Sequence, residues 1–194
     1  GRQGCTLHDY ATGAEHSPVV PAREQPGPKS VGNGLTFPRN LVGWAELHAG
    51  VTELADEVAV RLRGHGLKCT TLQVTIRDPN FKDICRQKRL SAPTYVAREL
   101  TETAMELIRA AWRENAPVRA LTLTAQALVE EGEAGEQLDL FAAGAAPRRD
   151  KLEKLEKAMD GIRGKFGRDA IAPASTVHRD RAEVKAEQRL PPVD

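Results

Sequence analysis

The sequence has few aromatic residues and few cysteines, and it has no long apolar run. Aromatic side chains make up 4% of the 194 residues, and Cys5, Cys69 and Cys85 include no C-x-x-C pair and no histidine at metal-ligand spacing. This pattern argues against a disulfide framework or a zinc site, so we expect reduced thiols and no metal or other cofactor. No apolar run approaches the roughly 18 residues that cross a bilayer, and no basic-then-apolar leader opens the chain. We therefore expect a soluble, monomeric, cytoplasmic protein without membrane contact.

Net charge is also small, but it is unevenly distributed. The formal net charge is +1. Residues 29–129 carry 14 Lys/Arg against 10 Asp/Glu, residues 130–141 carry none against 5, and residues 142–171 carry 8 against 5. A modestly basic segment followed by an acidic one is compatible with a polyanionic partner.

Hydrophobic periodicity predicts one α+β domain over residues 29–129. Residues 1–28 contain four prolines between positions 18 and 28 and are interpreted as a linker. The periods that follow predict strand 35–37, a helix from Trp44 that ends near Gly64 or Gly66, strands 71–77 and 81–90, a helix that Ser91 and Pro93 begin, and strand 118–128. This β-α-β-β-α-β order predicts a four-stranded antiparallel sheet with two helices on one face. The other face is then left for solvent or a ligand.

The polar positions of the strands indicate what the uncovered face would present. Thr71, Gln73, Thr75 and Arg77 alternate with apolar residues, as do Thr122, Thr124 and Gln126 in the last strand. A four-residue turn between the middle strands would add Lys82, Arg86 and Lys88 to this face, whereas a three-residue turn would add Asp83, Cys85 and Gln87. The sequence leaves both registers open, and the charge favours Arg86 and Lys88.

The five residues Gln137, Leu138, Asp139, Leu140 and Phe141 lie between an acidic, glycine-containing run and A-A-G-A-A-P. Such flanks favour neither helix nor strand, so we interpret residues 130–149 as a tether. We interpret the five residues as a motif that binds an apolar groove on another protein. The alternative is a short core strand. Residues 150–171 carry apolar side chains at helical spacing and predict an amphipathic helix that docks on the domain or on a partner. Residues 172–194 are expected to be disordered.

Several motifs occur together in one order. They are K-S-V-G-N-G-L-T-F-P-R-N-L at 29–41, R-L-R-x-x-G-L-K at 61–68, F-K-D-I-C-R-Q-K-R-L at 81–90 and V-R-A-L-T-L-T-A-Q-A-L at 118–128. Together they resemble the little finger domain of bacterial Y-family translesion DNA polymerases of the DNA polymerase IV-like kind. The five-residue motif follows where these enzymes carry their sliding-clamp motif, residues 155–171 resemble their tail, and residues 10–20 resemble the exit of their thumb domain.

The resemblance implies a role in DNA repair and damage bypass, with the open sheet face on the backbone of primer-template DNA and no sequence preference. Ser30, Asn33 and Thr36 match positions that the family turns toward DNA. The family usually has glycine where Thr122 stands and a basic residue where Pro38 stands, which reduces backbone approach and charge at those points. The predicted DNA-binding residues are Lys29, Ser30, Asn33, Thr36, Thr71, Gln73, Thr75, Arg77, Arg86, Lys88, Thr122 and Thr124.

The resemblance also identifies what this chain does not contain. Y-family enzymes hold two magnesium ions on carboxylates of a palm domain, because in-line phosphoryl transfer needs both oxygens neutralised. Asp56 and Glu57 are adjacent but lie within a helix, where we interpret them as a solvated face. We therefore expect the chain to be a non-catalytic fragment of a polymerase. Magnesium is expected only in the palm domain, which this chain does not include. The alternatives are an inactive adaptor that brings partners to the clamp and an RNA-recognition module, for which Phe81 is the only candidate stacking aromatic.

Overall fold

The computed structural model describes residues 2–19, 21, 27–132 and 146–172. Its elements, in chain order, are α1 (Arg2–Thr12), β1 (Ser30–Leu41), α2 (Trp44–Gly64), β2 (Leu67–Arg77), β3 (Asp83–Thr94), α3 (Ala97–Ala111), β4 (Val118–Glu130), α4 (Ala146–Phe166) and the 3-10 turn η2 (Arg168–Ala170). From β1 to β4 the order is β-α-β-β-α-β, which confirms the predicted fold class.

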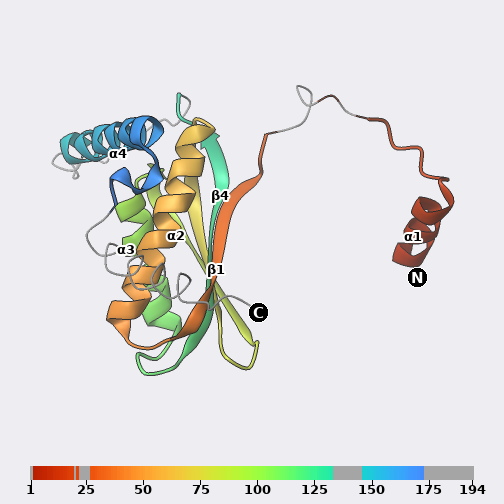
Figure 1. Ribbon diagram of the computed structural model, residues 1–194, viewed down its shortest axis with the longest axis horizontal. Helices are drawn as coiled ribbons and strands as arrows, with labels where there is room; N and C mark the ends of the chain where they lie inside the picture. The colour runs from red at the N-terminus through yellow and green to blue at the C-terminus, as the bar shows by residue number, and fades with distance from the viewer. Residues whose placement is uncertain (1, 20, 22–26, 133–145, 173–194) are drawn as a thin grey trace, which may run out of the picture.

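The four strands form one antiparallel sheet in the order β1-β4-β2-β3. The last strand therefore lies inside the sheet, between β1 and β2, and β1 and β3 form the two edges. Helices α2 and α3 lie together on one side of this sheet (Figure 1). The opposite side carries no helix in the part of the chain that the structure describes, so the expected open face is present.

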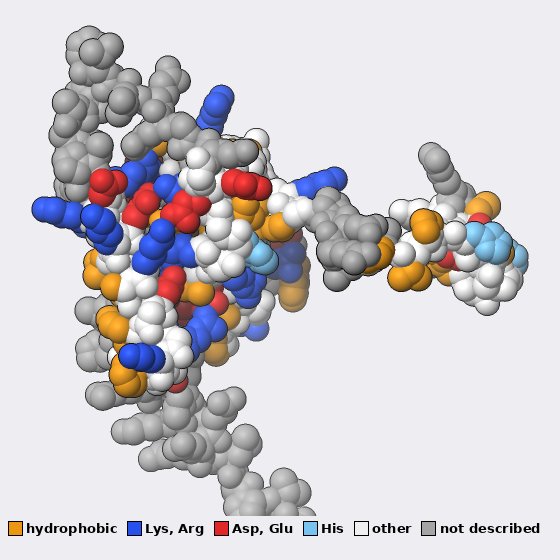
Figure 2. Space-filling model, turned by 90° about the horizontal axis from the view of Figure 1, so that it is seen from above, with side chains coloured by type: hydrophobic (Ala, Val, Ile, Leu, Met, Phe, Trp, Pro, Cys, Tyr) orange, Lys and Arg blue, Asp and Glu red, His pale blue; other side chains and the backbone are white. Residues whose placement is uncertain are grey.

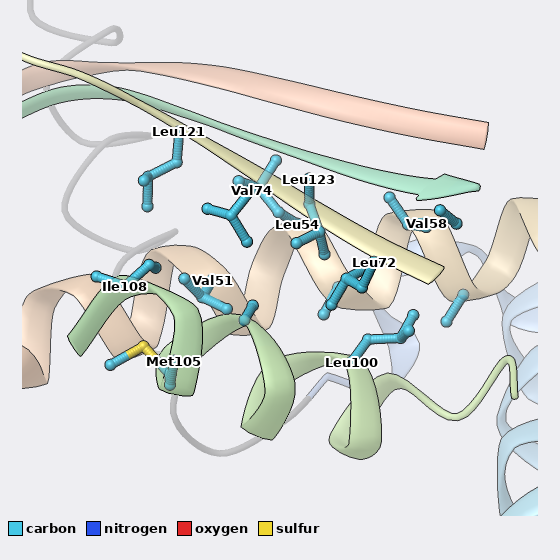
Figure 3. Close-up of a cluster of buried hydrophobic side chains, with 14 of the residues drawn as sticks. Val51, Leu54, Val58, Leu72, Val74, Leu100, Met105, Ile108, Leu121 and Leu123 are labelled. Atoms are coloured by element: carbon cyan, nitrogen blue, oxygen red, sulfur yellow. The ribbon is translucent and has the colours of Figure 1, made fainter. Parts of the chain in front are cut away.

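The core lies between the helices and the covered face of the sheet (Figure 3). Apolar residues at steps of three and four give each helix one buried stripe, and alternate residues of β2 and β4 meet it. The buried side chains include Leu47, Val51, Leu54, Val58, Leu62, Leu72, Val74, Ile76, Leu100, Met105, Ile108, Leu121 and Leu123. Each such side chain stabilises the fold by roughly 1.5–3 kcal/mol relative to exposure.

Several boundaries differ from the sequence predictions. Arg2–Thr12 is helical, although a linker was predicted across residues 1–28. Strand β3 continues to Thr94, so Ser91 and Pro93 belong to a strand and do not begin a helix. Helix α3 begins at Ala97 instead, where the Val96 N–H donates to Thr94 Oγ1 and the Ala97 N–H donates to a carboxylate oxygen of Glu156. One of the two acceptors at this helix start thus comes from α4, which no local pattern predicts.

Ion pairs hold α4 and the turn η2 on the domain, with partners on α2, α3 and β2 and just after β4. The guanidinium of Arg63 lies 2.7 Å from Glu156 and 2.5 Å from Asp160, and the Arg63 side chain is 5% exposed. Burial raises the pKa of Glu156, and the Arg63 charge opposes that rise. The other pairs are Lys68–Glu153, Arg149–Glu99, Lys157–Glu131, Arg163–Asp56 and Arg168–Glu57. Figure 2 looks onto this end of the domain and shows acidic and basic side chains intermixed.

Tyr95 lies at the centre of this contact. Its ring is buried, and the ammonium groups of Lys68 and Lys157 lie 5.0 and 5.9 Å from the ring centroid. Its hydroxyl lies 2.9 Å from Glu131 and 3.1 Å from Glu153, within hydrogen-bonding distance of both carboxylates. Burial raises the pKa of Tyr95, so the hydroxyl remains a neutral donor to them.

The structure corrects the interpretation of two acidic residues here and shows which face of α4 turns inward. Asp56 and Glu57 are not simply solvated, because they pair with Arg163 and Arg168. The apolar stripe of the C-terminal helix was expected to dock on the domain or on a partner, and Leu152 of this stripe packs against the core. Leu155 and Phe166 are 55% and 73% exposed, so α4 turns mainly its charged face inward.

Three predictions fall outside the described residues. They concern residues 133–145 of the predicted tether, its five-residue motif Gln137–Phe141, and the tail from residue 173. Residues 146–149, which the tether prediction included, belong to α4. Across the described ranges, no helix has the length and apolar character that crossing a membrane requires.

Candidate nucleic-acid interface

The open face of the sheet consists of four rows of four residues, set by the pairing of the strands. In antiparallel strands, residues directly opposite each other project to the same face. Leu72, Val74 and Ile76 are buried against the helices, so the rows through their neighbours in β2 form the open face. Written from β1 to β3, the rows are Ser30-Gln126-Thr71-Arg89, Gly32-Thr124-Gln73-Gln87, Gly34-Thr122-Thr75-Cys85 and Thr36-Ala120-Arg77-Asp83.

The turn between β2 and β3 fixes which residues of β3 belong to these rows. The Asp78 N–H donates to the Lys82 carbonyl at 3.0 Å and the Phe81 N–H to the Asp78 carbonyl at 3.1 Å, which closes a three-residue loop. Asp78 Oδ1 accepts from the N–H groups of Asn80 and Lys82. Phe81 has φ 62°, the left-handed conformation that the last residue of such a loop requires. The loop is therefore 79–81 and not the predicted 78–80, and Arg77 pairs with Asp83. Asp83, Cys85 and Gln87 lie on the open face, as the three-residue alternative predicted.

The expectation that Arg86 and Lys88 share the open face is wrong. Both pair with buried residues of β2, Arg86 with Val74 and Lys88 with Leu72, and therefore project from the edge strand toward the helix side. Lys88 Nζ lies 2.5 Å from a carboxylate oxygen of Glu106 on α3, which places it on that side. The physical reason is the period of two along a strand, because one residue more or less in the turn exchanges the faces of every following side chain.

Asn33 is also misplaced by the sequence prediction. It pairs with the buried Leu123, so it projects toward the helix side of β1. Eight of the predicted residues do share the open face, and Lys29 is exposed one residue before β1. The eight are Ser30, Thr36, Thr71, Gln73, Thr75, Arg77, Thr122 and Thr124.

Two glycines leave the backbone of β1 accessible on this face. A Cβ atom at Gly34 would lie 2.7 Å from the Thr122 hydroxyl oxygen, and one at Gly32 would lie 3.0 Å from that of Thr124. The space for Thr122, where the resemblance suggested glycine, is thus provided by the missing side chain of Gly34. Next to them Gln126 donates to Gln73 at 2.9 Å. The middle of the face is therefore neutral and rich in hydrogen-bonding groups.

Charge lies at the two ends of the face. Arg89 stands in the first row and is exposed, and it has no ion-pair partner among the described residues. Arg77 stands in the last row and forms two hydrogen bonds with Asp83, of 2.7 and 2.8 Å. The hydrogen bond from Arg77 lowers the pKa of Asp83, and the same bond raises the pKa of Arg77. The cation at this end is therefore matched by an anion on the same face.

Sequence reasoning missed Arg89 and the pairing of Asp83 with Arg77. The signal that could have found them is D-P-N before Phe81, since Asp and Pro are favoured at the first two positions of a type I turn and this turn leads into a three-residue loop. None of the residues in the four rows is aromatic. The base-stacking contacts of an RNA-recognition sheet therefore have no counterpart on this face.

Comparison with known proteins identifies the domain. The impB/mucB/samB family C-terminal domain matches residues 28–140, more than half of the chain. The chain belongs to this family. The match begins before β1 and includes all the strands, so the impB/mucB/samB C-terminal domain contains the whole sheet with both of its faces.

Relatives with high similarity are DNA polymerases. The chain is 35% identical over 167 residues to DNA polymerase IV of Acetivibrio thermocellus, covering 86% of this chain and 41% of the relative. It is 28% identical over 185 residues to DNA polymerase IV of Clostridium kluyveri, covering 93% of this chain and 46% of the relative. The chain thus spans less than half the length of these relatives. The resemblance to DNA polymerase IV-like proteins is confirmed.

A solved structure confirms the fold. A chimeric Y-family DNA polymerase matches with a TM-score of 0.50 and 15% identity, over 66% of this chain and 36% of that one. The fold is thus the α+β fold of the Y-family little finger.

Proposed function

We propose that this chain is the part of a translesion DNA polymerase that holds primer-template DNA, through the open face of its sheet, and that attaches the enzyme to the sliding clamp through residues 137–141. The function belongs to DNA repair and damage bypass. The observation that supports DNA binding is the open face itself, which is neutral and hydrogen-bonding in the middle and has Arg89 at one end and the paired Arg77 at the other. Family membership supports the same partner, because the relatives are DNA polymerases.

The dimensions of the face suit a duplex. Thr71 and Arg77 stand six residues apart on β2, which is about 20 Å at 3.3–3.4 Å per residue. That length corresponds to roughly six base pairs of B-form DNA. Arg89 and Arg77 would then approach phosphates at opposite ends of the contact, while threonine and glutamine side chains face the backbone between them. Such contacts carry no sequence information.

The salt dependence of binding follows from the cations available. Lys29, Arg89 and the partly neutralised Arg77 would contact two or three phosphates, so we expect a log-log salt slope of about −1.8 to −2.7.

Arg89 and Arg86 provide a matched test of which face binds DNA. They stand three residues apart on β3, both are exposed, and their pairing places them on opposite faces. Arg89→Ala is expected to weaken binding of a primer-template duplex roughly eightfold at 0.1 M salt and to reduce the slope by about 0.9, because one phosphate contact is lost. Arg86→Ala should change the affinity by less than about twofold, because its charge is distant and screened. Fluorescence anisotropy over a salt series measures both quantities.

The reverse result would contradict this assignment. If Arg86→Ala weakens binding and Arg89→Ala does not, DNA lies against the helix side of β3. If the unaltered chain shows no salt-dependent binding at all, the DNA-binding proposal is wrong.

We also propose that the segment represented by this chain holds DNA without catalysing nucleotide transfer. The chain alone is expected to extend no primer with either magnesium or manganese. The measurement is primer extension by highly purified chain, with the Arg89→Ala variant in parallel to reveal a contaminating polymerase. Extension that falls with Arg89→Ala would contradict the proposal.

A further inference from the structure

We propose that Asp83 weakens the binding of DNA to the open face. Its carboxylate pairs with Arg77 and so competes with a DNA phosphate for that guanidinium. This inference rests on the proposed function and adds a residue that sets its strength. A carboxylate on a surface that binds phosphates is unfavourable in itself, and here it also occupies the guanidinium that would bind one.

The geometry of the pair supports this role. Arg77 Nε and one terminal nitrogen contact the two carboxylate oxygens of Asp83 at 2.7 and 2.8 Å, the fork arrangement that Arg uses for phosphate as well. Arg77 and Asp83 are partners in the same row of the sheet, so the contact needs no displacement of either strand. Both side chains remain nearly half exposed, at 46% and 42%, and so are accessible to a ligand.

Asp83 is the charged residue that neutralises Arg77 on this face. The row contains only Thr36 and Ala120 besides the pair, and the two middle rows carry no charge. Asp78 begins the adjacent turn, but its carboxylate accepts the N–H groups of Asn80 and Lys82. Because Arg77 also lowers the pKa of Asp83, the carboxylate stays charged through the neutral range, and the competition persists there.

A double-mutant cycle tests the proposal on the full chain. Asp83→Asn is expected to tighten binding of a primer-template duplex roughly eightfold at 0.1 M salt and to steepen the salt slope by about 0.9, because Arg77 becomes available for one phosphate. In the Arg77→Ala background the same Asp83→Asn change should bring less than half of that gain in log affinity, since only the general loss of negative charge remains. Thermal melting of each variant checks that the sheet is intact.

Glu106→Gln is the charge-matched control. Glu106 forms the exposed pair with Lys88 on the other side of β3, so its loss changes the net charge equally without altering the open face. It should change the affinity less than about twofold. The proposal is overturned if Asp83→Asn has no effect, if its gain is equal in the presence and absence of Arg77, or if Glu106→Gln brings the same gain. Absence of any DNA binding by the unaltered chain would instead remove the proposed function on which this inference rests.

Discussion

The double substitution Leu140→Ala with Phe141→Ala is expected to abolish binding of the chain to a bacterial sliding clamp. Burial of Leu140, Phe141 and part of Leu138 in an apolar groove should stabilise the complex by roughly 2 kcal/mol each, while Gln137 fixes the orientation by hydrogen bonds at the edge of the groove. After the cost of ordering the segment, the expected affinity is micromolar. Surface plasmon resonance on immobilised clamp measures the loss.

A matched control uses apolar residues that the structure places on the surface. Leu155 and Phe166 of α4 are 55% and 73% exposed, and their replacement by Ala removes a similar apolar area close to the motif in the sequence. This control should keep the affinity for the clamp. The melting temperature of the domain and its binding to naked DNA should also stay unchanged in the Leu140 and Phe141 variant. A domain unfolded by that variant would mean that both residues belong to a core.

The two proposed contacts should reinforce each other. On DNA that the clamp encircles, the second contact becomes intramolecular, so the effective concentration of the partner is set by the length of the connecting segment. Two weak contacts then give a stronger and still reversible attachment. The proposed weakening of DNA binding by Asp83 agrees with this arrangement. A domain that bound naked DNA tightly would depend less on the clamp.

The replacement Arg63→Met is expected to release α4 from the domain. Arg63 is the shared partner of Glu156 and Asp160, so its loss leaves two carboxylates without their cation, one of them largely buried. Removal of one partner of a buried ion pair costs about 3–5 kcal/mol. Since Leu152 is the α4 residue that packs against the core, little apolar contact opposes release. Hydrogen exchange should show lost protection in α4 with protection retained in β2 and β4.

An exposed pair and a compensating change provide the controls. Arg98→Met breaks the surface pair with Glu102, in which both side chains are 59% exposed, and should cost at most about 0.5 kcal/mol. Adding Glu156→Met to Arg63→Met replaces both members of the buried ion pair with apolar side chains. This double variant should restore part of the hydrogen-exchange protection of α4. If α4 keeps its protection in Arg63→Met, the two Arg63 pairs are not required to hold the helix, and the remaining ion pairs suffice. If β2 and β4 lose protection as well, α4 is an integral part of the core.

The sequence by itself determined the β-α-β-β-α-β order and the existence of an open face. The reason is local, because Leu72, Val74 and Ile76 alternate with polar residues while α2 and α3 carry apolar residues at helical spacing. Partition between core and solvent follows directly from such periods, whatever the detailed pairing. The family resemblance was likewise contained in the order of the motifs.

Only the tertiary structure decided the faces of β3 and the inward face of α4. The faces of β3 depend on the left-handed conformation of Phe81, which its residue type does not favour and which closure of the β2–β3 hairpin requires. The inward face of α4 depends on Arg63 meeting Asp160, 97 residues away in the sequence. Periodicity describes how one segment divides between core and solvent, but charges pair with whatever the fold brings near them. Leu155 and Phe166 of α4 therefore stay exposed while Glu156 and Asp160 turn inward to Arg63.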